Sequence, residues 1–294
     1  MKAPIAIFGF NRPGHLRAMV ESLKSNKSWN EREIYVFVDG ARNADEEEKV
    51  REVVSIARGL TGHVVVSETN KGLAQSIIGG VTEVIDRHGR AIVLEDDLVL
   101  LPRFLEFMDQ ALDVYQSDER IMSVCGYGLK IRRPKGYEGD VYLSRRSSSW
   151  GWATWADRWH TVDWNVSDWP SLRNDRTRQR AFNRGGSDMY SMLRGYMEGR
   201  NRSWAIRFCY SQFLQNRWSV HPFRTLVQNE GFGADATNCK QTYSRFKTVP
   251  EDRVMHNFEM PSELMPHFRI LRKNAYYHGF LLRLYSRIRK KFNI

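Results

Sequence analysis

The chain has 294 residues, of which 41% are hydrophobic, and a formal net charge of +11 at pH 7. This length can bury a substantial core, either as one large α/β domain or as two closely packed halves. The ordinary hydrophobic content excludes a disordered chain and a membrane-spanning one. The large positive charge indicates an anionic partner.

Cysteine usage and the first residues predict the compartment. Residues 4–10 form an apolar run that is far too short for a transmembrane helix, and Asn11-Arg12-Pro13 interrupts it, so we expect no signal peptide. Cys125, Cys209 and Cys239 are widely spaced and odd in number, which provides no disulfide framework and no CxxC metal motif. We therefore expect a cytoplasmic protein whose cysteines are buried and inert.

Strand and helix patterns alternate through the first half of the chain. Short β-branched or apolar runs predict strands at 5–10, 34–38, 64–66 and 91–94, and apolar residues at helical spacing predict helices over 16–23, 50–57 and 77–85. This alternation is typical of a mostly parallel sheet with helices on both faces.

Acidic residues follow two of these strands directly. Glu95-Asp96-Asp97 comes after the strand at 91–94, and Asp39-Gly40 comes after the strand at 34–38. In an open α/β sheet, ligands bind in the crevice beyond the carboxyl ends of the strands. Clustered carboxylates there favour Mg²⁺ or Mn²⁺, and such a cation favours a phosphate-bearing ligand. A solvated acidic turn is the alternative interpretation.

The second half is rich in tryptophan and arginine, and its strand and helix patterns are weaker. Tryptophan is densest between Trp150 and Trp169, and Gly151 lies within the Trp150-Gly151-Trp152 stretch. Indoles that reach a polar cleft stack on the apolar faces of sugars or bases, but we expect most of these to be core residues. Gly151 permits a backbone conformation or a close approach that other residues resist.

The C-terminal segment is strongly basic. From Arg269 to Ile294 there are eight Lys or Arg residues and no Asp or Glu. Helical spacing places Tyr277, Leu281, Leu284, Ile288 and Phe292 on one face, and Arg283, Arg287 and Lys290 on the other. Such a helix can lie in an anionic membrane interface, which we favour slightly over an ordinary docked helix with a solvated basic face.

These motifs, taken in order, resemble a known enzyme family. The series runs through Asn11-Arg12-Pro13, Asp39-Gly40, Asn70-Lys71-Gly72-Leu73, Glu95-Asp96-Asp97-Leu98 and Trp150-Gly151-Trp152. It looks like a GT-A-fold glycosyltransferase, similar to bacterial family-2-type sugar transferases of surface polysaccharide synthesis. It also resembles the N-acetylglucosaminyltransferase I family, which likewise carries Glu-Asp-Asp in place of Asp-x-Asp. The resemblance covers about residues 4 to 240 and is clearest up to about residue 110.

The resemblance implies a role for each motif. Asp97 would ligate Mn²⁺ or Mg²⁺, Asp96 would face the donor sugar and take part in catalysis, and Glu95 would contact the ribose or a bound water. Asp39 would accept a hydrogen bond from the uracil imide, so the donor would be a UDP-sugar. The remaining donor-binding positions that it implies are Phe8, Asn11, Arg12, Asn70, Lys71, Trp150, Gly151 and Trp152.

An inverting transfer needs a general base, and the sequence offers no clear one. Relatives often place an acidic residue at the start of a helix after the acceptor-binding segment. The matching stretch here begins at Asn201, and its Ser203 is a better helix N-cap than a base. Asp188 is the nearest acidic candidate and Asp157 is another; without a base, the enzyme retains configuration or has lost activity.

A later loop, residues 229–239, also resembles the family. Relatives often have a His where Asn238 stands, and Asn is a poor metal ligand that can still hydrogen-bond a diphosphate. Gly231 and Gly233 suggest a lid that closes over the donor, and a plain surface turn is an equal alternative.

The sequence thus predicts a metal-dependent GT-A glycosyltransferase that transfers a sugar from a UDP-sugar to a glycan or lipid-linked glycan. We expect a nucleotide-sugar-binding half (1–125), an acceptor-binding and catalytic half (126–245) and a C-terminal extension with a basic amphipathic helix (246–294). The protein would be peripheral on the inner membrane face and would bind no nucleic acid. Alternatives are a non-catalytic sugar-binding relative and a basic nucleic-acid-binding protein using Lys130, Arg132, Arg133, Lys135, Arg145 and Arg146.

Overall fold

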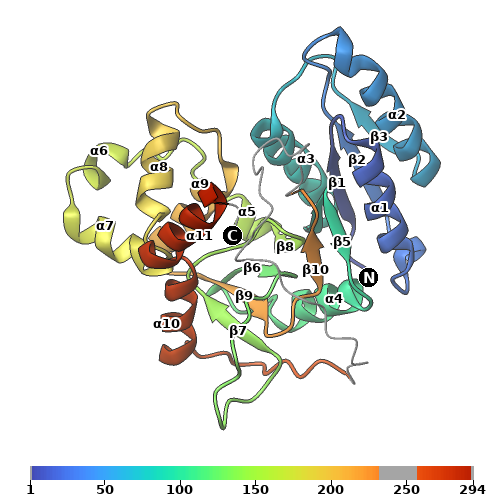
Figure 1. Ribbon diagram of the computed structural model, residues 1–294. Coiled ribbons are helices and arrows are strands. Elements are labelled where there is room, and N and C mark those ends of the chain that lie inside the picture. Colours follow the sequence, from blue (N-terminus) through green and yellow to red (C-terminus); the bar gives the residue numbers. More distant parts are fainter. Residues whose placement is uncertain (1, 232–256, 293–294) are drawn as a thin grey trace.

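The computed structural model describes residues 2–231 and 257–292, and an eight-stranded sheet runs through the molecule (Figure 1). The strand order is β3-β2-β1-β4-β8-β6-β9-β7. The strands are β1 Ile5–Gly9, β2 Ile34–Val38, β3 His63–Val66, β4 Arg90–Glu95, β6 Ile121–Cys125, β7 Val141–Ser144, β8 Trp152–Trp155 and β9 Trp218–Pro222. A small second sheet pairs β5, Leu98–Leu100, with β10, Val227–Asn229.

Helices cover both faces of the large sheet and form a lobe beside its second half (Figure 1). They are α1 Pro13–Lys24, α2 Ala44–Leu60, α3 Leu73–His88, α4 Phe104–Val114, α5 Ala156–Trp159, α6 Trp169–Leu172, α7 Arg176–Phe182, α8 Met189–Met197, α9 Trp204–Leu214, α10 Phe268–Tyr277 and α11 Phe280–Phe292. Two 3-10 turns, η1 Trp29–Glu31 and η2 Asn183–Gly185, complete the described elements.

The first half confirms the predicted alternation of strands and helices. β3, β2, β1 and β4 are parallel neighbours, and α1, α2 and α3 connect them. Pro13 begins α1, where its missing N–H is not needed and its fixed φ suits the helix. Alternate residues of β1 face opposite sides: Ile5 and Ile7 pack against α1 and α2, whereas Ala6 and Phe8 pack against α3.

The second half enters the same sheet by antiparallel pairing. β8 lies between β4 and β6 and is antiparallel to both, and β7 is antiparallel to β9. The predicted boundary after residue 125 falls at the end of β6, inside this continuous sheet. Helices α6 to α9 build a smaller core of their own around Phe182, Leu193 and Ile206.

Buried aromatic and sulfur-containing side chains confirm two sequence-based expectations. Trp152, Trp155 and Trp159 are at most 2% exposed, so these tryptophans are core residues. Cys125 and Cys209 are buried free thiols, and Cys239 lies outside the described residues.

The C-terminal segment contains two helices where the sequence predicted one. α10 ends at Tyr277 and α11 begins at Phe280, with His278 and Gly279 between them. Tyr277 belongs to α10, and its hydroxyl donates to the Lys130 carbonyl at 2.8 Å, so it does not share a face with the apolar residues of α11. The reason is local: Gly279 interrupts the helix, and the sequence pattern alone did not register the break.

Candidate active site

Three adjacent parallel strands deliver the predicted site residues to one edge of the sheet. Phe8 of β1 lies level with Phe37 of β2 and Glu95 of β4, so the segments that follow these strands emerge side by side. The Asp39 backbone N–H, just past β2, donates to the Gly9 carbonyl at 3.1 Å. The Asn11-Arg12, Asp39-Gly40 and Glu95-Asp96-Asp97 motifs therefore meet at the carboxyl ends of the strands, where α/β proteins bind ligands.

One arginine joins the carboxylates of β4 to the start of α1. Arg12 donates from Nη2 to Asp96 Oδ1, and from Nη1 to Asp97 Oδ2 at 3.2 Å. Asp96 is 3% exposed, and its second oxygen, Oδ2, has no hydrogen-bond partner among the described residues. A buried carboxylate oxygen without a partner is costly, which marks this point as a place where a cation or a donor is missing.

The pKa shifts of Glu95 and Asp96, within the carboxylate trio of Glu95, Asp96 and Asp97, indicate that the site needs more positive charge than Arg12 supplies. Burial raises the pKa of Asp96 to about 6, with Asp97 adding to the rise and Arg12 opposing it. Burial and the neighbouring Asp97 and Asp96 carboxylates also raise the pKa of Glu95 far above its usual range, although Arg12 and the Ser149 hydroxyl lower it. Three clustered carboxylates with one guanidinium are under-neutralised, and a further cation would favour their charged forms.

A segment from the second half closes over Asp97. Asn229, at the end of β10, donates from Nδ2 to Asp97 Oδ1 at 3.0 Å, and the Glu230 N–H donates to the Asp97 carbonyl at 2.8 Å. A Cβ on Gly231 would lie 2.3 Å from Asp97 Oδ2, so any larger residue would displace the Asp97 carboxylate or this segment. The predicted lid thus begins beside the carboxylates, and its remainder from residue 232, including Gly233 and Asn238, lies outside the described residues.

The carboxylates fit a divalent cation in chemistry and charge. Asp96 and Asp97 offer hard oxygen donors, one of them unpartnered, and among the described residues only the Arg12 guanidinium forms an ion pair with them. Within residues 2–231 and 257–292, no cluster of three or more His, Cys, Asp or Glu side chains is arranged for a metal, and Arg12 and Asn229 donate hydrogen bonds to the two oxygens of Asp97. A cation that takes Asp96 Oδ1 or Asp97 Oδ2 as a ligand would compete with Arg12 for that oxygen.

Asp39 organises the loop that leads into α3. Its Oδ1 accepts from the N–H of Lys71 and its Oδ2 from the N–H of Gly72, both at 2.8 Å. Asn70 Nδ2 donates to the Gly40 carbonyl at 2.8 Å, and a Cβ on Gly40 would lie 2.6 Å from the Thr69 backbone. The predicted Asp39, Asn70 and Lys71 thus form one cradle. The carboxylate of Asp39 already has backbone donors, and the side chain of Lys71 is exposed.

Asn11 belongs to a second polar network that the sequence analysis missed. Its Nδ2 donates to Glu46 Oε1 at 2.9 Å, and Arg42 donates to the same carboxylate from Nε at 3.0 Å. Hydrogen bonds from Arg42 lower the pKa of Glu46 to about 2. The Arg42 guanidinium also lies over the Phe10 ring at 5.1 Å. The available signal was the Asn43-x-x-Glu46 capping pattern at the start of α2, where the Asn43 side chain accepts from the Glu46 N–H.

Aromatic residues predicted to bind the donor divide into core and edge positions. Phe8 is 3% exposed and stacks on Phe37, and Trp152 is fully buried against Trp204, so both side chains belong to the core. Gly151 has φ +58°, and its carbonyl accepts from the Gly126 N–H, which fixes the turn beside β4. Trp150 is half-buried against Tyr127 and is the predicted indole nearest to solvent.

The candidate general bases do not join this cluster in the described contacts. Asp188 is buried before α8 and accepts from Arg146 Nη1 at 2.7 Å. Burial acts to raise its pKa, but Arg146, together with His278 and Arg283, brings the pKa below its usual value, which weakens Asp188 as a base. Ser203 confirms its predicted role as the N-cap of α9, since it accepts from the Ile206 N–H at 3.3 Å.

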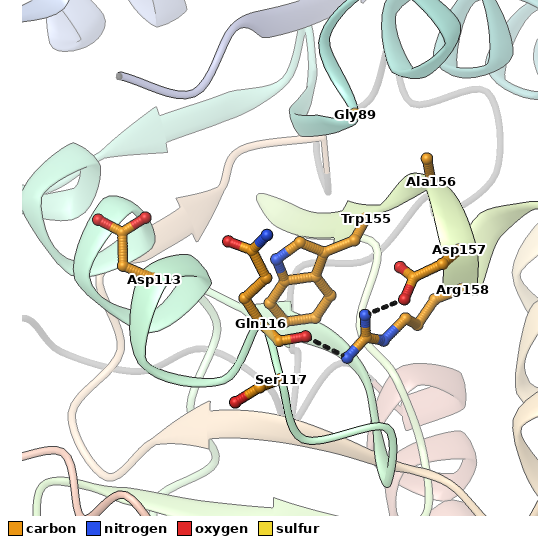
Figure 2. Close-up of a pocket in the computed structure, with 8 residues that line it drawn as sticks. All are labelled: Gly89, Asp113, Gln116, Ser117, Trp155, Ala156, Asp157 and Arg158. Carbon is orange, nitrogen blue, oxygen red and sulfur yellow. Dashed lines mark hydrogen bonds and ion pairs between the residues drawn. The ribbon is translucent and has the colours of Figure 1, made fainter.

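The other candidate base, Asp157, borders a pocket at the opposite edge of the sheet. β8 runs from Trp152, level with Val93, to Trp155, level with Arg90 at the amino end of β4. Figure 2 shows the pocket of about 550 Å³ beside Trp155, where Asp157 and the Gln116 carbonyl accept hydrogen bonds from Arg158. Because this pocket lies away from the carboxylate trio, Asp157 is not a base for chemistry at Asp97.

No protein-family model matches the sequence. Among solved structures, GalNAc-T7 with UDP, GalNAc and Mn²⁺ is similar at a TM-score of 0.50 and 12% identity, over 77% of this chain and 43% of that one. The mannosyltransferase PcManGT from Pyrobaculum calidifontis, in complex with GDP-Man and Mn²⁺, has a TM-score of 0.37 and 11% identity, over 53% and 45%. A cytidylyltransferase from Leptospira borgpetersenii has a TM-score of 0.35 and 16% identity, over 59% and 68%.

These likenesses bear on the fold. This chain spans less than half the length of the first two proteins, and only the first reaches a TM-score of 0.50, at an identity that establishes architecture alone. The similarity to GalNAc-T7, together with the parallel β3-β2-β1-β4 strands and the antiparallel pairing of the second half, confirms the predicted architecture. The chain has a GT-A fold, with a Rossmann-like, mostly parallel first half and a mixed α+β second half.

Proposed function

We propose that the protein is a metal-dependent glycosyltransferase that moves a hexosyl or N-acetylhexosaminyl group from a UDP-sugar to a glycan. The observation that carries this proposal is the meeting of Arg12, the Asp39 cradle and the Glu95-Asp96-Asp97 trio at one sheet edge. A cradle of backbone and amide groups suits a base and ribose, whereas under-neutralised carboxylates suit a cation that accompanies a diphosphate.

In this proposal the chain's own groups bind and orient the donor. Asp97, with Asp96, would hold Mn²⁺ or Mg²⁺, which when bound offsets the charge on the departing UDP. The cradle around Asp39 would bind the uridine. The turn at Trp150 and Gly151, beside the end of β4, would border the donor sugar. Transfer is proposed to be inverting; Asp188 stays a prediction as its base, weakened by its ion pair with Arg146.

Calorimetric titration with UDP, GDP, CMP and dTDP, each with and without Mn²⁺, tests this proposal. We expect Mn²⁺-dependent binding of UDP alone, because Asp39 would select the uracil imide and the trio would require the metal. Binding of another nucleotide would keep the fold and change the donor. Failure of all four nucleotides to bind would contradict the proposal and favour a sugar-binding relative.

The alternative of nucleic-acid binding is less well supported. Two of the six cationic side chains considered for it, Arg133 and Arg146, already pair with carboxylates of the protein.

We further propose that the acceptor is lipid-linked, in surface polysaccharide synthesis, and that α11 holds the enzyme on the inner membrane face. Leu281, Leu284, Tyr285 and Ile288 follow the i, i+3, i+4, i+7 spacing of one helix face and are 74%, 41%, 50% and 48% exposed. The segment from Arg269 onward carries eight basic and no acidic residues, which suits an anionic surface. No helix within the described residues is long and apolar enough to cross a membrane.

The double substitution Leu281→Ser and Leu284→Ser tests the membrane proposal. It removes two leucines from the exposed face without changing charge, so we expect binding to vesicles containing anionic phospholipid to weaken by at least about tenfold. Co-sedimentation measures the effect. Leu214→Ser is the matched control, because Leu214 is 44% exposed on α9, outside the C-terminal helices. Equal sedimentation of the double variant and the parent protein would contradict the role of α11.

A further inference from the structure

Arg12 already occupies the position of a counter-ion to the carboxylate trio. Its two terminal nitrogens divide between Asp96 Oδ1 and Asp97 Oδ2, so that one guanidinium bridges both carboxylates. A planar guanidinium suits such a two-pronged contact better than an ammonium group does. Arg12 therefore supplies, in the protein by itself, positive charge where the proposed cation would supply it.

The bridge leaves the carboxylates incompletely satisfied. Asp96 is 3% exposed, and its Oδ2 is buried without a hydrogen-bond partner among the described residues. The single positive charge of Arg12 therefore neutralises the three carboxylates only in part. A divalent cation carries more charge and could reach the free oxygen, so it would stabilise the carboxylates more strongly than Arg12 does.

Among the described residues, the side chain of Arg12 is held only by its contacts with Asp96 and Asp97. It is the N-cap residue of α1, and its side chain makes no capping hydrogen bond. The hydrogen bonds described for its guanidinium go to Asp96 and Asp97, and its side chain is 19% exposed. Its release would break two contacts without disturbing the packing of Leu16 and Met19, which anchor α1 to the core.

We propose that Arg12 is a resident counter-ion that competes with the divalent cation for Asp96 and Asp97, and that the cation displaces it when the site is loaded. The released guanidinium lies at the same sheet edge and is then available to the phosphates of the donor. Arg12 is thus a positioning residue that couples metal binding to donor binding. This inference rests on the proposed function, since it assumes that a metal binds at the trio.

Titration of the nucleotide-free protein with Mn²⁺ alone tests the competition. We expect Arg12→Gln to bind Mn²⁺ about tenfold more tightly than the parent protein, because the competing charge is gone. Arg12→Lys keeps a charge but not the fork, so its affinity should fall between the two. Arg17→Gln is the control: Arg17 also lies on α1, is about half exposed and pairs with Glu52 away from the trio. It should leave the Mn²⁺ affinity unchanged.

Thermal melting gives a second readout that does not depend on activity. Without metal, Arg12→Gln should melt at a lower temperature than the parent protein, because buried Asp96 loses its only charged donor among the described residues. Added Mn²⁺ should raise the melting temperature of Arg12→Gln more than that of the parent protein. An equal or weaker Mn²⁺ affinity in both Arg12 variants would overturn the inference. If the parent protein binds UDP with Mn²⁺ and both Arg12 variants bind Mn²⁺ no more tightly than the parent, the proposed function stands and only the proposed role of Arg12 is wrong. If the parent binds neither, the proposed function fails as well.

Discussion

Replacing Asp97 with alanine is expected to lower sugar transfer by about three orders of magnitude. A metal that offsets charge on a leaving diphosphate contributes several kcal/mol to the transition state, and about 4 kcal/mol corresponds to about a 1,000-fold change in rate. The Asp97 carboxylate accepts hydrogen bonds from Arg12 and Asn229 and lies close to Gly231. Its loss would remove the proposed metal ligand on which these three residues converge. The rate of transfer from the donor identified by nucleotide titration measures the effect.

The same substitution should change the stability of the fold very little. Asp97 loses its bonds to Arg12 and Asn229, but its removal also relieves repulsion with Asp96. Asp113→Ala is the control, because Asp113 is an exposed carboxylate that pairs with Arg90, outside the site. It should leave the rate within about twofold of the parent protein. An Asp97→Ala variant that transfers sugar at the parent rate would remove the metal role from this residue.

Replacing Asp39 with asparagine should weaken both the cradle and nucleotide binding. The Asp39 carboxylate accepts from the N–H groups of Lys71 and Gly72 on its two oxygens, and an asparagine can accept on only one. Its amide N–H₂ would face a partly buried backbone donor, so we expect a loss of about 1 kcal/mol in the free energy of unfolding. UDP affinity should fall by about 10- to 100-fold, because the loop that forms the cradle is no longer held.

Chemical denaturation and calorimetry separate these two effects of Asp39→Asn. Asp45→Asn serves as the control, since Asp45 is exposed in the first turn of α2 and should change stability by no more than about 0.5 kcal/mol. A stable variant with unchanged UDP affinity would show that the uridine binds elsewhere. Loss of stability with unchanged affinity would assign Asp39 to the fold alone.

The local sequence determined the first half of the protein and the edge where its site lies. Periodicity of two or 3.6 residues is a property of the backbone, so β1 to β4 and α1 to α3 follow from short windows. Parallel strands place their carboxyl ends together, and for that reason acidic motifs separated by more than fifty residues, at Asp39 and Asp96, were predicted to share one edge.

The partners of the site residues were decided only by the tertiary structure. Arg12 reaches Asp96 across 84 positions through the pairing of β1 with β4. Asn229 reaches Asp97 across 132 positions through the pairing of β10 with β5. No short window of the sequence contains either pairing. The burial of Trp152 depends in the same way on contact with Trp204 in α9, since a tryptophan suits a sugar cleft and a core equally well.

Hydrogen bonding and charge pairing explain the remaining differences. A carboxylate is recognisable in a sequence, but whether it faces a ligand, a backbone N–H or a guanidinium depends on which donors the fold brings near it. Asp39 accepts hydrogen bonds from the backbone N–H groups of Lys71 and Gly72, and Asp188 accepts one from the guanidinium of Arg146. The sequence by itself determined which residues carry charge and at which edge of the sheet they emerge; the tertiary structure decided how each charge is satisfied, because those partners come from distant parts of the chain.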